Sequence, residues 1–102
     1  AHDGLKKLLL KQVAEGKQVA AICAAPLVLG GLELLKGKNA TCYPGFEAQL
    51  LGANITGEKV TVDGTITTGK GPGLVFDFVL QLVENIAGKG VRDKVAQGLL
   101  LL

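Results

Sequence analysis

The sequence is poor in the residue types that mark several functional classes. Methionine and tryptophan are absent, aromatic residues make up only 4% of the 102 residues, and there is a single histidine. Eleven basic and nine acidic residues give a net charge of +2, with no basic stripe that would support nucleic-acid binding. No apolar run approaches the roughly 18 residues of a membrane-spanning helix, and no cluster has the spacing of metal ligands. We therefore expect no nucleic-acid partner, no membrane contact, no metal and no cofactor.

The cysteine count and the start of the chain bear on location and completeness. Two cysteines without a signal-like segment do not form a disulfide framework, so a reducing cytoplasm is the expected location. The chain begins without methionine and leads directly into a helical pattern. We expect that it is incomplete and that further strands precede Ala1.

The residues that are plentiful are aliphatic residues and glycine. Hydrophobic residues make up 48% of the chain, 15 residues are glycine, and the mean hydropathy is +0.38. This composition excludes disorder and favours layers of helix and sheet with many tight turns. The length is that of one domain.

The first half of the chain reads as helix, buried strand and helix. Asp3 is a plausible N-cap for an amphipathic helix that ends at Gly16. A continuous apolar run over residues 19–22 predicts a strand covered on both faces, as in a parallel sheet. A second helix is predicted over residues 24–35, apolar almost all round and therefore deeply packed.

The second half reads as short strands followed by helices. Residues 40–43 predict a strand, and residues 46–51 one or two helical turns. Asp63-Gly64 between two β-branched runs is a strong hairpin signal. A long helix is predicted over residues 74–87, stopped by Gly88. A last helix carries Val91 and Val95, and its apolar tail is expected to dock on the domain.

One stretch, Val19-Ala20-Ala21-Ile22-Cys23-Ala24-Ala25-Pro26, predicts a thiol at a sharp turn from strand to helix. Proline fits the first turn of a helix, and Ala21 and Ala25 are the small residues that a nucleophile elbow needs on either side of its nucleophile. A thiol at that corner would face unpaired N–H groups, which favour the reactive thiolate. The spacing alone is equally consistent with Cys23 being a small buried core residue.

Several groups of residues together resemble a known family. The stretch Ala20-Ala21-Ile22-Cys23-Ala24-Ala25-Pro26 is followed in order by Thr41-Cys42-Tyr43-Pro44, Asp63-Gly64, Thr67-Thr68 and Gly71-Pro72-Gly73. In order and spacing they resemble the C-terminal part of the ThiJ/PfpI superfamily, in the branch of the parkinsonism-associated protein deglycase. The resemblance implies a three-layer flavodoxin-like α/β sandwich with a mostly parallel sheet plus a β-hairpin. Residues 1–102 would then be the C-terminal part of a single domain whose N-terminal strands are missing, and the protein a homodimer.

The resemblance also implies a site. Cys23 would be the reactive residue, and the N–H of Ala24 would bind an oxyanion. Tyr43 stands where the family often has a histidine, and a phenol, which keeps its proton near neutral pH, is a poor general base. Pro44 and the Gly71-Pro72-Gly73 turn would complete the pocket, the turn either cradling an anion or only letting the backbone approach closely. A family glutamate and a second oxyanion donor would precede Ala1, so the N-terminal part of the same protein would be a partner of this chain.

The implied function is that of a cysteine-dependent hydrolase or lyase of the deglycase or glyoxalase type, acting on small reactive carbonyls or glycated substrates. One alternative is a PfpI-like intracellular peptidase or amidase, which a tyrosine at position 43 disfavours. Another is a non-catalytic redox-sensing chaperone. Sequences of this kind are also labelled with thiazole monophosphate biosynthesis, but no residue here recognisably binds a thiazole or pyrimidine.

The other chemically capable residues have simpler interpretations. Cys42 is expected to be a small buried residue rather than a reactive thiol. His2 lies near the start of the chain and is not expected to be catalytic. Lys70 is interpreted as a surface charge close to the mouth of the site.

Overall fold

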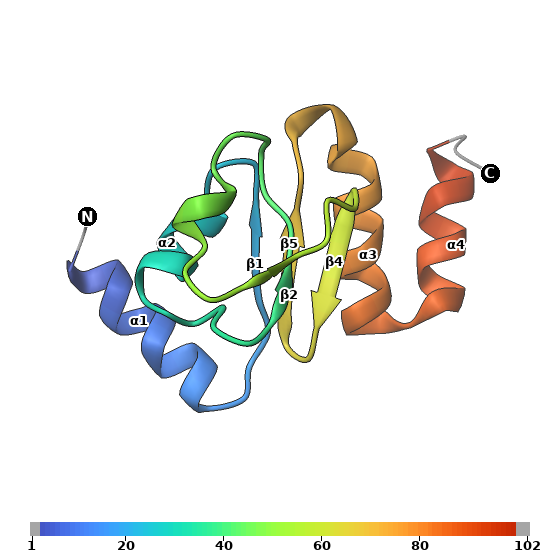
Figure 1. Cartoon of the computed structure of the whole chain (residues 1–102). Coiled ribbons are helices and arrows are strands. Elements are labelled where there is room, and N and C mark those ends of the chain that lie inside the picture. Colours follow the sequence, from blue (N-terminus) through green and yellow to red (C-terminus); the bar gives the residue numbers. More distant parts are fainter. Residues whose placement is uncertain (1–2, 100–102) are drawn as a thin grey trace.

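Helices and short strands alternate along the chain (Figure 1). The structure is a computed structural model that describes residues 3–99. The elements in order are α1 (Asp3–Ala14), β1 (Val19–Ile22), α2 (Pro26–Gly31), β2 (Asn39–Ala40), the 3₁₀ turn η1 (Glu47–Gln49), β3 (Asn54–Ile55), β4 (Val60–Asp63), β5 (Ile66–Gly69), the 3₁₀ turn η2 (Pro72–Leu74), α3 (Val75–Ala87) and α4 (Lys89–Gly98).

The described strands form two small sheets. The larger has the order β1-β5-β4, with β5 parallel to β1 and antiparallel to β4. The smaller pairs β2 with β3 in parallel. An additional bond from the backbone N–H of Asn39 to the carboxylate of Asp63 (2.8 Å) links β2 to the end of β4. The fold is thus of the mixed α/β, flavodoxin-like class that the resemblance implies.

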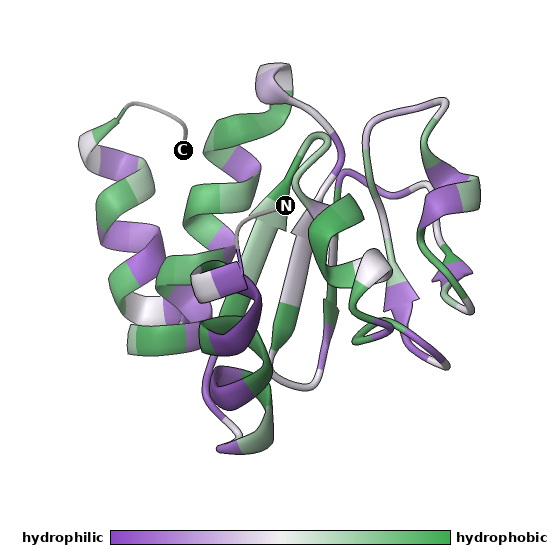
Figure 2. Ribbon diagram, turned by 90° about the vertical axis from the view of Figure 1, so that its left-hand side faces the viewer, coloured by the Kyte–Doolittle hydropathy of each residue, from purple (hydrophilic) through white to green (hydrophobic). Residues whose placement is uncertain are grey.

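Strand β5 separates two layers because its side chains alternate between the two faces of the sheet. Thr67 and Gly69 face α3, since Asn85 donates a hydrogen bond to the Thr67 hydroxyl (2.9 Å) and Phe78 packs against Gly69. Thr68 faces the other way, toward the segment that follows β2. Figure 2 shows the strands between α3 on one side and α2 with β2 on the other.

The hydrophobic core lies mainly on the α2 side of the sheet. Its buried members come from the strands, from α2 and from the loops around β2 and η1, and they are Val19, Leu29, Leu35, Ala40, Cys42, Leu50 and Ile66. From α1, only Leu9 and Val13 pack against this cluster, while Leu5, Leu8 and Leu10 remain exposed. Helix α1 therefore covers the sheet with a narrow part of its apolar face.

The structure confirms the predicted hairpin and the predicted long helix, which is α3. β4 and β5 are joined through Gly64 and Thr65, with Asp63 opposite Ile66, and Gly64 has a φ of +60°. A 3₁₀ turn precedes α3, which ends at Ala87 before Gly88, as expected. One turn of 3₁₀ helix, η1, lies within residues 46–51, where one or two helical turns were predicted.

The prediction for α2 was wrong in length. The helix begins at Pro26 and ends at Gly31, and residues 32–37 form turns rather than further helix. Two consecutive glycines weaken the helix, and Glu33 adopts a φ of +60° that ends it. Leu29 is buried, whereas Leu27 and Val28 are only half-buried, so α2 is less deeply packed than its composition suggested.

Several other details differ from the sequence predictions. Asp3 is a residue of α1 rather than a cap outside it, whereas Gly16, with a φ of +70°, closes the end of the helix as predicted, two residues after Ala14. β2 covers only Asn39–Ala40 instead of residues 40–43, and β3 was not predicted. β1 lies at the edge of the described sheet with Ala20 exposed, so within residues 3–99 it is not covered on both faces.

Helix α4 packs on α3 and is joined to it by charges. Arg92 forms ion pairs with Glu84 of α3 (3.0 Å) and with Asp93 (2.9 Å). Ala96 is buried, whereas Val91 and Val95 are exposed. The predicted docking of the apolar tail concerns residues 99–102, of which Leu99 is exposed and the rest lie outside the described residues.

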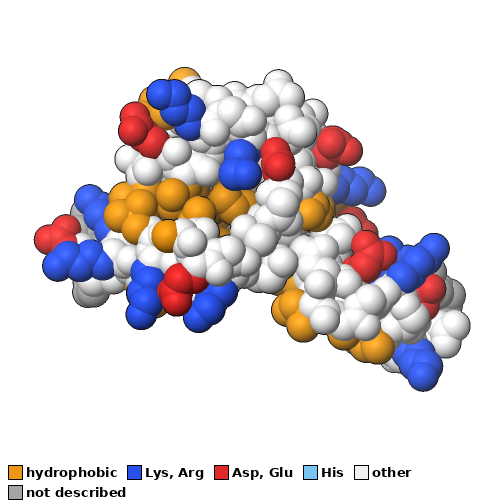
Figure 3. All heavy atoms as spheres, turned by 90° about the horizontal axis from the view of Figure 1, so that it is seen from below, with side chains coloured by type: hydrophobic (Ala, Val, Ile, Leu, Met, Phe, Trp, Pro, Cys, Tyr) orange, Lys and Arg blue, Asp and Glu red, His pale blue; other side chains and the backbone are white. Residues whose placement is uncertain are grey.

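Much apolar surface remains exposed on the described chain. Ile86 and Leu8 are 76% and 60% exposed, and Phe76 is also largely exposed. Seen from below, hydrophobic side chains gather on the side of the molecule where α1 lies (Figure 3). Within residues 3–99, no helix combines the length and the apolar character needed to cross a membrane.

Candidate functional site

Cys23 lies at a strained corner immediately after β1. Its φ of +65° falls in the left-handed region, which L-residues other than asparagine and aspartate rarely adopt. The turn is closed by a hydrogen bond from the N–H of Ala25 to the carbonyl of Ile22 (3.1 Å). The N–H of Cys23 donates to the carbonyl of Gly69 at the end of β5 (3.0 Å). The corner is therefore held by the neighbouring strand, which offsets the conformational strain.

The thiol at this corner is half-buried and lies beside an unused backbone donor. The Ala24 amide donates no hydrogen bond within the described residues, and Ala24 is exposed. Two positions further on, Pro26 opens α2 and has no N–H. An N–H that is free and directly follows the cysteine is the group that could bind a developing oxyanion.

The two small residues around the cysteine differ in their surroundings. Ala21 packs against the hydrophobic core, so a larger side chain would meet neighbours there. Ala25 is exposed, so crowding within residues 3–99 does not explain its small size.

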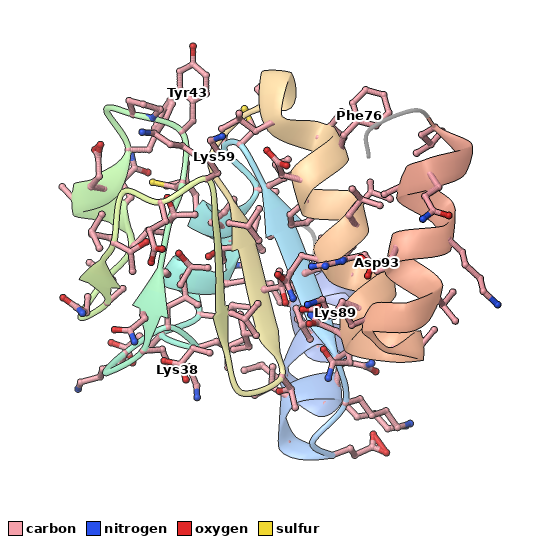
Figure 4. The ribbon with its side chains drawn as sticks, turned by 90° about the vertical axis from the view of Figure 1, so that its right-hand side faces the viewer. Lys38, Tyr43, Lys59, Phe76, Lys89 and Asp93 are labelled. Carbon is pink, nitrogen blue, oxygen red and sulfur yellow. The ribbon has the colours of Figure 1, made fainter. Side chains whose placement is uncertain are left out.

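Tyr43 is joined to the corner through its backbone. Its N–H donates to the carbonyl of Cys23 (2.8 Å). Its side chain is 44% exposed, points away from the ribbon, and lies at the same end of the molecule as Phe76 (Figure 4). The ring tilts against that of Phe46, with the centroids 6.3 Å apart. The structure thus attaches the backbone of Tyr43 to the Cys23 corner, with the ring pointing outward.

The Gly71-Pro72-Gly73 turn lies next to Tyr43. A Cβ at Gly71 would come within 3.8 Å of the Tyr43 ring, an ordinary contact, and one at Gly73 would meet nothing. Pro72 and Gly73 are exposed, and so is Pro44. Close packing within the described chain therefore does not require these two glycines. Gly69, which the sequence reasoning did not single out, is the crowded one.

A carboxylate stabilises the loop that follows Tyr43. Glu47 accepts two hydrogen bonds from the N–H of Gly45 (2.9 and 3.0 Å). These bonds, with the carboxylate's own backbone N–H and the nearby charge of Lys70, lower the pKa of Glu47. Lys70 also donates to the carbonyl of Gly57 (3.3 Å). The loop after Tyr43 therefore carries a negative charge that is close enough to Lys70 to be stabilised by it.

Cys42 is buried, as expected for a small core residue. Burial raises the pKa of its thiol, and the negative charge of Glu47 raises it further. Because the thiolate is the nucleophilic form, Cys42 is the less reactive kind of cysteine. His2, the single histidine of the sequence, lies outside the described residues.

Two buried threonines connect the segment that carries Tyr43 to β5, and the sequence patterns did not assign them a role. The Thr68 hydroxyl accepts a hydrogen bond from the N–H of Thr41 (2.9 Å). The Thr41 hydroxyl is the one buried side-chain polar atom of the described chain that makes no hydrogen bond. Both threonines belong to the motifs that carry the family resemblance, but neither the motifs nor the alternation of strand faces says what the two side chains contact.

The best-formed cavity of the described chain does not lie at the Cys23 corner. A cavity of about 370 Å³ between α3 and α4 is lined by Phe76, Asp77, Leu80, Gln81, Arg92, Asp93 and Ala96, none of which belongs to the Cys23 corner. No group of three or more histidine, cysteine, aspartate or glutamate side chains within residues 3–99 could hold a metal ion.

A parallel strand, a cysteine at positive φ directly after it, and a short helix together have the strand–turn–helix backbone that a nucleophile elbow uses, in an α/β protein. Residues 1–85 match the model of the DJ-1/PfpI family. The chain belongs to this family.

Relatives and solved structures agree with this assignment. Protein dj-1beta of Drosophila melanogaster is 40% identical over 96 residues, which are 92% of this chain and 51% of that protein. An isonitrile hydratase of Pseudomonas putida is 37% identical over 79 residues (76% and 35% of the two chains), and a deglycase of Pyrococcus abyssi is 32% identical over 76 residues (72% and 46%).

Among solved structures, oxidized DJ-1 of Toxoplasma gondii superposes with a TM-score of 0.89 at 36% identity, covering 96% of this chain and 54% of that one. This chain therefore spans about half the length of dj-1beta and of the Toxoplasma protein.

Proposed function

We propose that this chain carries the nucleophile of a cysteine-dependent enzyme that acts on reactive carbonyl compounds. The observation that carries the proposal is the corner itself: Cys23 is held at φ +65° and is followed by an amide, that of Ala24, with no hydrogen-bond partner among the described residues. Strained backbone of this kind is concentrated at functional sites. The relative named deglycase supports this class of substrate.

In the proposed reaction the Cys23 thiolate attacks the carbonyl carbon of a compound such as methylglyoxal. A carbon–sulfur bond forms, the π electrons of the carbonyl move to its oxygen, and that oxygen takes up a proton to give a hemithioacetal. The Ala24 N–H binds the oxyanion before it is protonated. We propose that the glutamate that manages the proton is supplied by the N-terminal part of the protein, outside these 102 residues, and that the protein acts as a homodimer.

The peptidase or amidase alternative receives less support. Such chemistry needs a group that first takes up the proton of the nucleophile as a base and then, once protonated, donates a proton to the leaving group. This group is most often a histidine. Tyr43 occupies the position implied for that histidine, and its ring is half-exposed. A relative bears the name isonitrile hydratase, so family membership by itself does not choose the substrate.

The test is turnover by the protein at its full natural length. The wild type and Cys42→Ala are expected to consume methylglyoxal, and Cys23→Ser is expected to lose at least about 100-fold in kcat because a serine hydroxyl at neutral pH is a far weaker nucleophile than a thiolate. Cys42→Ala is the matched control for loss of a thiol. Equal activity of Cys23→Ser and wild type would end the proposal. Absence of turnover together with ready oxidation of Cys23 would favour the redox-sensing alternative.

A further inference from the structure

The Thr68 hydroxyl makes an unusual link between two parts of the site. Thr68 is 1% exposed and directly precedes Gly69 on β5. It accepts a hydrogen bond of 2.9 Å from the N–H of Thr41, a residue that follows β2. The bond therefore joins the central strand to a segment from a different sheet.

No strand ladder replaces this bond. β2 pairs only with β3 among the described strands and ends at Ala40. Beyond that point, residues 41–43 are connected to the larger sheet and its corner by two hydrogen bonds: Thr41 N–H to the Thr68 hydroxyl, and Tyr43 N–H to the Cys23 carbonyl. One of the two depends on a side chain and can be removed by substitution.

These bonds close a ring around the cysteine. Cys23 donates to the carbonyl of Gly69, Gly69 follows Thr68, Thr68 binds Thr41, and Tyr43, two residues later, donates back to Cys23. We propose that Thr68 is a positioning residue of the Cys23 site, whose hydroxyl holds the segment that carries Tyr43 against the corner. The catalytic consequence of this proposal rests on the proposed function, whereas its structural consequence does not.

Valine at position 68 has the shape of threonine but cannot accept a hydrogen bond. The Thr41 N–H would then be buried without a partner, since Thr41 is fully buried, and an unpaired buried amide is strongly disfavoured. The segment would relax away from β5 to hydrate that group. The Tyr43 N–H bond to Cys23 would open more often, and the Tyr43 side chain would leave its place beside Gly71.

The chain offers a matched control next to this bond. The Thr41 hydroxyl is buried and makes no hydrogen bond, so Thr41→Val exchanges a hydroxyl for a methyl group and leaves the N–H bond to Thr68 in place. Thr68→Ser keeps the hydroxyl and removes only a methyl group. A role in packing alone would make Thr68→Ser the more harmful change at position 68, whereas a role in positioning would make it the milder one.

The experiment uses the protein at its full natural length. For wild type, Thr68→Val, Thr68→Ser and Thr41→Val, amide hydrogen exchange of Tyr43 is measured by NMR, with amides of α3 as internal reference. The rate of Cys23 alkylation by iodoacetamide and the kcat and KM for methylglyoxal are measured on the same samples. Thr68→Val is expected to speed exchange of the Tyr43 amide about tenfold relative to the amides of α3, because one buried hydrogen bond is lost. The same variant is expected to change the rate of Cys23 alkylation. It is also expected to lower kcat more than it changes KM. Thr68→Ser and Thr41→Val are expected to remain close to wild type.

The proposal is overturned if Thr68→Val leaves the relative exchange of the Tyr43 amide unchanged, or if Thr41→Val speeds it as much. If Thr68→Val does not fold, Thr68→Ala compared with Thr68→Ser decides the same question. If the wild type consumes no carbonyl substrate, the proposed function fails, while the exchange of the Tyr43 amide still decides the role of Thr68.

Discussion

The backbone N–H of Tyr43 donates a hydrogen bond of 2.8 Å to the carbonyl oxygen of Cys23. Because main-chain atoms make this bond, the side chain at position 43 can differ between relatives without detaching the segment from the thiol corner. The tyrosine that replaces an expected histidine is therefore compatible with an intact corner. The change alters the side chain that this segment carries, and not the backbone bond that attaches the segment to the corner.

The strain at Cys23 predicts an unusual order of stabilities. We expect Cys23→Gly to have a higher free energy of unfolding than Cys23→Ala, by about 0.5–1 kcal/mol. Glycine adopts positive φ without the roughly 1–2 kcal/mol penalty of an L-residue. Only part of this advantage is lost, because glycine makes the unfolded chain more flexible. Urea unfolding of the full-length variants measures the difference. At Cys42, which does not have a positive φ, the same pair should show the reverse order. A lower stability for Cys23→Gly than for Cys23→Ala would contradict the prediction.

Two adjacent glycines of α2 predict opposite effects of an added methyl group. A Cβ at Gly30 would lie 2.6 Å from the Gln49 carbonyl oxygen and 2.8 Å from the Leu50 Cα, both backbone atoms, whereas one at Gly31 would meet nothing within 4 Å. We expect Gly30→Ala to lower the free energy of unfolding by about 1–3 kcal/mol through overpacking. Gly31→Ala should leave it unchanged or raise it by up to about 1 kcal/mol, because alanine favours helix. Similar values for the two variants would show that α2 does not pack this closely on η1.

The two cysteines are expected to differ in reactivity. Burial, and then the charge of Glu47, raise the pKa of Cys42 above its ordinary value of 9.0, so near neutral pH the protonated thiol is the main form, and it is buried as well. Iodoacetamide should therefore modify Cys23 first, and peptide mapping by mass spectrometry can follow both sites. In the unfolded protein the two rates should become similar. Faster labelling of Cys42 in the folded protein would contradict the assignment of Cys23 as the reactive thiol.

Glu47 predicts a pH dependence of stability with a defined sign. Hydrogen bonds from Gly45 lower its folded pKa below the ordinary 4.5, so the carboxylate contributes stability above that value and loses it as the pH falls through the folded pKa. The difference in unfolding free energy between wild type and Glu47→Gln should be constant above about pH 5 and should shrink as the solution becomes more acidic. Urea titrations at several pH values measure it. A difference that grows on acidification would contradict the sign.

Residues 1–102 expressed alone are expected to lack a cooperative thermal transition. β1 lies at the edge of the described sheet, and large apolar side chains such as Leu8, Phe76 and Ile86 are exposed. Open strand edges and apolar surface favour association over a unique fold. Differential scanning calorimetry of the isolated chain, with the full-length protein as control, provides the test. A single sharp transition of a monomer would contradict this prediction.

Local patterns predicted the elements whose causes lie within a few residues. The hairpin follows from β-branched residues on both sides of Asp63-Gly64, and the end of α3 follows from Gly88. The early end of α2 was predicted wrongly because the apolar composition of residues 24–35 resembles that of a longer helix, although Gly30-Gly31 is a local signal against one. The left-handed conformation of Glu33 and the contact of Gly30 with η1 appear only when the chain is folded.

The sequence by itself determined that a cysteine stands between an apolar strand and a proline-initiated helix, because small residues, a thiol and a proline in that order restrict the backbone locally. It also carried enough motifs to place the chain in its family. Only the tertiary structure decided that the Gly69 carbonyl and the Tyr43 amide bind Cys23, and that the Thr68 hydroxyl binds the amide of Thr41. The three segments that carry these groups, around residues 23, 41–43 and 68–69, are far apart along the chain. They come together because β5 lies beside β1 and one face of β5 receives the segment after β2, a juxtaposition that no local pattern of residues encodes.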